Sequence, residues 1–133
     1  SIKQFRDIGD AWFLAHALNL EGNFALAEGQ ETQAKSSFKE ACSIAFANQS
    51  VPIILDSLTG LAILDQKNGR HEQALETALF VRTHGASTWE TKKRAEKLCD
   101  ELENKLAPAQ IEAARSRVQL INLDVKAREI TCQ

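Results

Sequence analysis

The sequence predicts an all-α fold built from antiparallel helical hairpins, and three observations support this. The chain resembles itself at a spacing of about 40 residues, at which Gly29 falls on Gly69. Apolar residues recur at the three- and four-residue spacing of helices that bury one face. No segment between turn signals alternates apolar and polar residues for long, so we expect almost no strand.

The repeat is clearest around the two glycines. The segment Glu-Gly-Gln-Glu-Thr-Gln-Ala-Lys (28–35) aligns with Asn-Gly-Arg-His-Glu-Gln-Ala-Leu (68–75). Glycine at the end of a helix accepts the positive φ that a tight turn requires. A small alanine near the start of the next helix allows close packing, and the same alignment places Ala34 on Ala74. Both segments are therefore predicted to be helix, glycine turn, helix.

These signals divide the chain into four parts of a single domain covering residues 1–133, a length that one hydrophobic core can stabilise. Residues 1–10 are expected to be the end of a preceding repeat. Residues 11–48 and 49–86 each form a hairpin, and residues 87–133 form C-terminal cap helices.

Within the cap, Thr88-Trp89-Glu90-Thr91 is typical of a helix start. We expect one helix over about 88–106, a second from Pro108 to about Arg117, and a short last helix over about 124–130. The cap is more charged than the hairpins, as the outer face of a terminal repeat requires.

Composition restricts the partners that the chain can bind. A formal net charge of -2 provides no broad cationic surface, so direct nucleic-acid binding is not expected. Lys92, Lys93, Arg94 and Lys97 form a basic cluster among acidic residues; we interpret it as a solvated helix face, with contact to a phosphate or an acidic partner as the alternative. No apolar run is long enough for a membrane helix. Three widely spaced cysteines favour reduced thiols and a cytoplasmic location.

No arrangement of residues indicates catalysis. There is no nucleophile, base and orienting group in a recognisable motif, and no glycine-rich phosphate loop. His71-Glu72 begins like a zinc-protease helix but lacks the second histidine four residues after the first. We therefore expect no enzyme activity, no cofactor and no metal site.

Gly22 followed by Ala34-x-x-x-Phe38-x-x-Ala41 resembles the tetratricopeptide repeat, over about residues 11–84. The period of about 40 residues is similar to that of the degenerate repeats in the C-terminal regions of large bacterial transcriptional regulators and signal-transduction ATPases. This resemblance implies a right-handed superhelix of hairpins with a C-terminal capping helix. It also implies a non-catalytic protein–protein interaction or regulatory sensor module, forming the C-terminal part of a larger bacterial regulator.

In tetratricopeptide arrays the first helix of each hairpin lines a concave groove. The resemblance places seven partner-binding candidates there: His16, Asn19, Asn23, Asp56, Thr59, Ile63 and Gln66. For each of them an ordinary solvent-exposed position is an equally good interpretation. Trp89 is a further candidate, because a large aromatic among polar neighbours suits a binding hot spot, although packing at a hairpin junction is the alternative.

The expected partner is a protein or peptide, or another domain of the parent chain. A homodimer is also expected if truncation uncovers the face that carries Phe5, Trp12 and Phe13. The alternative function is a sensor domain that holds a small-molecule effector in the groove. Such a domain would relay binding to an upstream switch or DNA-binding domain.

Overall fold

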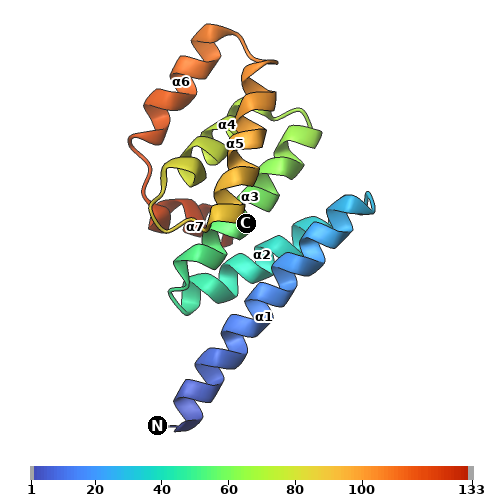
Figure 1. The fold of residues 1–133 in the computed structure, drawn as a ribbon, viewed down its shortest axis with the longest axis vertical. Helices are drawn as coiled ribbons and strands as arrows, with labels where there is room; N and C mark the ends of the chain where they lie inside the picture. Colours follow the sequence, from blue (N-terminus) through green and yellow to red (C-terminus); the bar gives the residue numbers. More distant parts are fainter. Residues whose placement is uncertain (1, 132–133) are drawn as a thin grey trace.

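The computed structural model describes residues 2–131, with side chains described for residues 6–130, and this part of the chain forms seven α-helices and no strand. It confirms the predicted all-α class. Phe5 and Cys132 lie outside the described side chains. The helices are α1 (Ile2–Ala27), α2 (Glu31–Ala47), α3 (Val51–Lys67), α4 (His71–Thr83), α5 (Trp89–Glu103), α6 (Pro108–Val118) and α7 (Leu123–Thr131), shown in Figure 1.

From α1 to α5, each helix packs against the next helix along the chain. Helices α1 and α2 form the first pair, and α3 packs against both of them (Figure 1). Helix α5 packs on α3 and α4, and α6 packs on α4, so the first two helices of the segment predicted as a cap both pack on the second hairpin. Residues 2–10 continue into α1 without a break, whereas we expected them to belong to a separate, preceding repeat.

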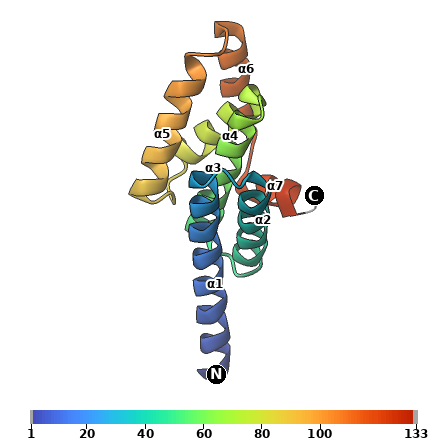
Figure 2. The same cartoon turned by 90° about the vertical axis from the view of Figure 1, so that its right-hand side faces the viewer.

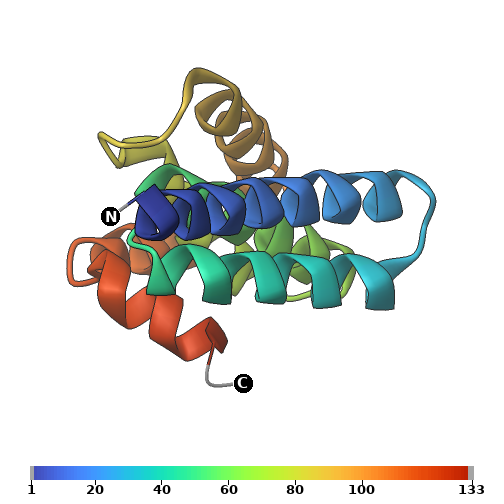
Figure 3. The same cartoon turned by 90° about the horizontal axis from the view of Figure 1, so that it is seen from below.

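Helix α7 turns back toward the first hairpin. It packs against α2, on the side away from α1, as Figures 2 and 3 show. The boundaries of the three C-terminal helices agree with the predicted ones to within a few residues. Thr88 caps α5 as expected, because its hydroxyl accepts a hydrogen bond from the Thr91 N–H at 3.2 Å. The return of α7 to α2 creates the wall of a cleft that no local pattern in the sequence indicates.

The first three turns share one backbone geometry and are evenly spaced along the chain. Gly29, Gln49 and Gly69 have φ of 76°, 56° and 81°, all in the left-handed region. The next residue in each turn donates its N–H to the carbonyl five positions earlier, a Schellman cap, with distances of 2.8, 2.8 and 2.9 Å for Gln30, Ser50 and Arg70. The structural repeat is therefore one helix and one turn, and Gln49 occupies a glycine position.

One aromatic ring holds the first three helices together. Phe38 of α2 is fully buried, between Gly22 of α1 and Gly60 of α3. A Cβ at Gly22 would lie 2.6 Å from the Cε1 atom of this ring, and a Cβ at Gly60 would also overlap it. Helices α1 and α3 therefore approach α2 closely because both lack a side chain at the contact.

Candidate functional site

Two of the predicted groove residues, Asn19 and Thr59, are fully buried. The Asn19 Nδ2 donates to the Ile53 carbonyl at 3.2 Å, and its Oδ1 accepts a hydrogen bond from the Ser57 hydroxyl at 2.8 Å. The Thr59 hydroxyl donates to the Leu55 carbonyl at 2.8 Å. These polar groups are satisfied inside the protein, and those of Asn19 join α1 to α3. We correct their placement: they lie in the core, where a partner at the surface does not reach them.

Asn23 and Asp56 come together, but Arg94 of α5 binds both. The Arg94 guanidinium donates to the Asp56 carboxylate at 2.8 Å and to the Asn23 Oδ1 at 2.9 Å. Burial raises the pKa of Asp56, and the nearby charges of Arg94 and His16 only partly oppose that shift. Arg94 thus turns inward from the basic cluster and links three helices.

The remaining candidates differ in their surroundings. Gln66 donates to the Glu101 carboxylate of α5 at 3.0 Å, and Ile63 is half-buried against the core. His16 is exposed and stacks on Trp12 with ring centroids 5.3 Å apart. Trp89 is 71% exposed, with the Lys93 ammonium 5.7 Å from its ring centroid. Helix α5 therefore crosses much of the predicted groove, and only His16 and Trp89 of the eight candidates are exposed.

Most of the large apolar side chains that are exposed among the described residues lie on α1. Phe13 is 67% exposed and Phe24 is 69% exposed, and Leu20 lies between them in the chain. These three residues are spaced by seven and four positions, which places them on one side of the helix. Trp12 packs edge-on against Phe13, with ring centroids 5.1 Å apart. We call Phe13, Leu20 and Phe24 the α1 apolar face.

The internal repeat shows what such a face does elsewhere in the chain. When Gly29 is aligned on Gly69, Phe13, Leu20 and Phe24 fall on Ile53, Gly60 and Leu64 of α3. Those three are buried: the Ile53 carbonyl accepts from Asn19, Gly60 contacts Phe38, and Leu64 packs with Ala25, Ala34 and Phe38. Helix α3 uses these positions to pack on the preceding hairpin, and α1 exposes the equivalent positions. The sequence predicted that Trp12 and Phe13 would be uncovered, but not the full face.

Comparison with known proteins yields no match to a protein family, a characterised protein or a solved structure. Within residues 2–131, none of the helices combines the length and the apolar character needed to cross a membrane. Over the same residues, no cluster of three or more His, Cys, Asp or Glu side chains is arranged to hold a metal ion.

Proposed function

We propose that this chain is a non-catalytic interaction module of the tetratricopeptide type, and that its α1 apolar face binds a helical hairpin of a partner protein. The observation that carries the proposal is the equivalence of Phe13, Leu20 and Phe24 with the α3 positions that pack on α1 and α2. A partner hairpin would stack on α1 as the first hairpin stacks on α3. Recognition would thus repeat a contact that the protein already makes internally.

The apolar area favours such a contact. Burying one large apolar side chain contributes about 1.5–3 kcal/mol. Because 56–69% of each side chain of the α1 apolar face is still exposed, burying the three contributes roughly 3–6 kcal/mol before the cost of association is subtracted. Trp12 is also exposed on α1 and, through its edge-on contact with Phe13, extends the surface. A second helix in the partner would supply the remaining contacts.

The shape of the face restricts the partner. Gly60 leaves room for Phe38 in the internal contact, but Leu20 stands at the equivalent position of α1. A second copy of α2 would therefore place its Phe38 against Leu20, where the two side chains would overlap. The partner helix should instead carry a small residue opposite Leu20. This requirement disfavours head-to-tail stacking of identical chains and selects a different protein.

The proposal includes the wider context that the resemblance implies: a right-handed tetratricopeptide superhelix in the C-terminal part of a cytoplasmic bacterial regulator. The Schellman turns at Gly29 and Gly69 and the close contacts of Phe38 support the repeat type. The exposed Trp89 and His16 are proposed as a second, smaller contact. Transcription regulation or signal transduction would then be the role of the parent protein.

Photo-crosslinking tests the proposal. A benzophenone amino acid would replace Phe13 or Phe24, with the exposed Lys105 as the control position, and crosslinked proteins would be identified by mass spectrometry. We expect one protein to be captured from both α1 positions and not from Lys105, through a peptide within a helical hairpin.

The purified partner would then be titrated by calorimetry against the wild type and a Phe13→Ser/Phe24→Ser variant. We expect the dissociation constant to rise at least about tenfold in the variant. An unchanged dissociation constant would refute the proposal. A homodimer seen by light scattering and abolished in the same variant would also refute it, because the face would then be a contact between copies.

A further inference from the structure

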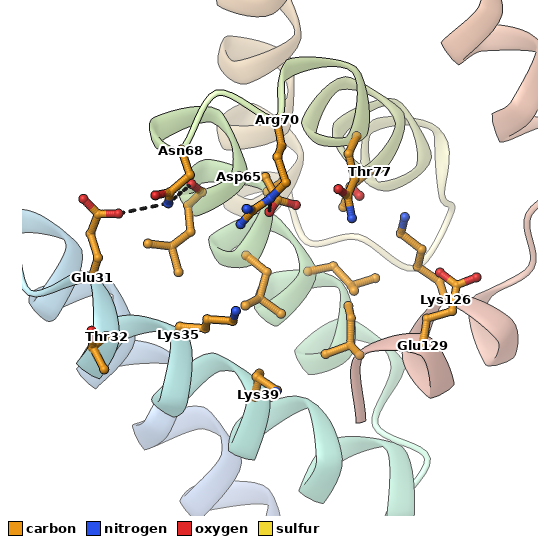
Figure 4. Close-up of a pocket in the computed structure, with 16 residues that line it drawn as sticks. Glu31, Thr32, Lys35, Lys39, Asp65, Asn68, Arg70, Thr77, Lys126 and Glu129 are labelled. Atoms are coloured by element: carbon orange, nitrogen blue, oxygen red, sulfur yellow. Dashed lines mark hydrogen bonds and ion pairs between the residues drawn. The ribbon is translucent and has the colours of Figure 1, made fainter. Parts of the chain in front are cut away.

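A cavity of about 600 Å³ lies between α2, α3, α4 and α7, and it shares no residue with the α1 apolar face. Leu58, Leu61 and Leu64 of α3 form apolar lining, and Ile130 of α7 adds to it. Lys35 and Lys39 project from α2 and Lys126 from α7 (Figure 4). The volume is within the range of small-molecule sites, about 300–1,000 Å³. The cavity thus combines apolar lining with cationic groups from two separate helices.

Lys126 is the unusual member of this lining. It is only 7% exposed, and Figure 4 shows its side chain reaching into the cavity from α7. Among the described residues, no hydrogen bond or ion pair holds its ammonium group. The stem of the side chain is enclosed, but its nitrogen keeps contact with the solvent in the cavity, because no buried side-chain nitrogen or oxygen among the described residues lacks a hydrogen-bond partner. A ligand that supplies an anion here would give this ammonium group the counter-charge that the protein does not provide.

The other charges around the cavity leave an excess of cations. Arg70 is held by Asp65 at 2.9 Å, and the Glu31 carboxylate accepts a hydrogen bond from Asn68 at 3.0 Å. Lys35 and Lys39 form no ion pair within the part of the chain that the structure describes, and the other carboxylate in the lining is Glu129. Three lysines thus face two carboxylates, Glu31 and Glu129, so the lining keeps a net charge of +1. The local field favours an anion.

We propose that this cleft binds a small organic anion, with a carboxylate or phosphate head on an apolar body. The head lies among Lys126, Lys35 and Lys39, because lysine ammonium groups bind such anions as point charges. The body lies over Leu58 and Leu61. This site goes beyond the proposed partner contact and does not depend on it.

Ligand binding would also act on α7. Lys126 comes from α7 and Lys35 and Lys39 come from α2, so the like charges oppose the packing of these two helices. An anion between them replaces repulsion with attraction. Occupancy of the cleft therefore tightens the docking of α7 on α2, and amide hydrogen exchange in residues 123–131 reports it.

The experiment uses the whole chain and four probes: decanoate, decyl phosphate, inorganic phosphate and uncharged decanol, each below its micelle concentration. Thermal unfolding and calorimetry measure binding. The variant Lys126→Met removes the charge and keeps an unbranched apolar stem, and Lys35→Met provides a second test that does not alter a buried residue. Lys92→Met, at an exposed position of α5, is the matched control.

We expect a saturable rise in Tm with decanoate or decyl phosphate, slower exchange in α7, and a dissociation constant at least about tenfold higher in Lys126→Met. Lys92→Met should bind as the wild type does. If circular dichroism shows that Lys126→Met does not fold, the proposal requires the tenfold rise in the dissociation constant to appear in Lys35→Met instead. Absence of saturable binding would overturn the proposal, as would equal binding of decanol, equal binding of inorganic phosphate, or equal loss in Lys92→Met.

Discussion

Substituting Gly60 by alanine tests the close packing around Phe38. The added Cβ would overlap three carbons of the Phe38 ring, with Cε2 only 2.6 Å away. The ring has no free side to move toward, because it is fully buried and Gly22 of α1 is in close contact with it. Overpacking of this kind costs about 1–3 kcal/mol. Alanine in place of glycine inside a helix returns up to about 1 kcal/mol.

The upper half of the overpacking range applies, because the ring is confined by two backbones. We therefore expect Gly60→Ala to lower the free energy of unfolding by about 1–2 kcal/mol, the overpacking cost less the gain in helix propensity. In a Phe38→Leu background the smaller side chain gives the new methyl group room. There the same substitution should be neutral or stabilising, so that the two sites are coupled by at least about 1 kcal/mol.

Urea unfolding followed by circular dichroism at 222 nm measures all four proteins of this cycle. Gly9→Ala is the matched control, because Gly9 also lies inside a helix but a Cβ there would meet nothing within 4 Å. It should stabilise the chain by up to about 1 kcal/mol. A Gly60→Ala effect that is the same in both backgrounds, or that equals the Gly9→Ala effect, would refute the packing argument.

Three further predictions concern single positions. Gln49→Gly should raise the free energy of unfolding by about 0.5–1 kcal/mol in urea titrations, because φ is positive there; a loss of stability would contradict this. The Asp56 carboxyl should titrate above its ordinary pKa of 3.8 by NMR, and higher still in Arg94→Gln. Because the native state then binds this proton more tightly than the unfolded state does, the contribution of Asp56 to stability should fall as pH rises from 3.8 through its folded pKa. A titration midpoint below 3.8 would contradict this prediction. Burial raises the pKa of the Cys42 and Cys99 thiols to about 11. Alkylation of both thiols at pH 8, mapped by mass spectrometry, should therefore be at least about 100-fold slower in the native chain than in urea. Comparable rates would exclude the buried environment.

The helices and their turns were predictable because they depend on local signals. Glycines at positions 29 and 69 mark left-handed turns, and Thr88 marks a helix start, through interactions among residues close in the chain. Gln49 adopts the same turn as the two glycines without their signal. Its neighbouring helices pack against each other strongly enough to impose a conformation that the residue itself disfavours.

The groove residues were less predictable, because burial depends on which helices pack on a face. The polarity of Asn19 suggested a surface position, but its partners, the Ile53 carbonyl and the Ser57 hydroxyl, come from another helix, 34 and 38 positions further along the chain. The sequence pattern places Arg94 in a cluster of solvated cations, but the packing of α5 brings its guanidinium to Asn23 and Asp56. The position of a residue on a helix does not by itself show which polar side chains will form hydrogen bonds with one another.

The sequence by itself determined the all-α class, the internal repeat and the helix boundaries, because periodicity and capping act over a few residues. Only the tertiary structure decided that Phe38 sits between two glycines, that α1 exposes the face that α3 buries, and that α7 returns to α2 and places Lys126 in a cleft. These features depend on contacts between segments far apart in the chain, and no local pattern encodes such contacts.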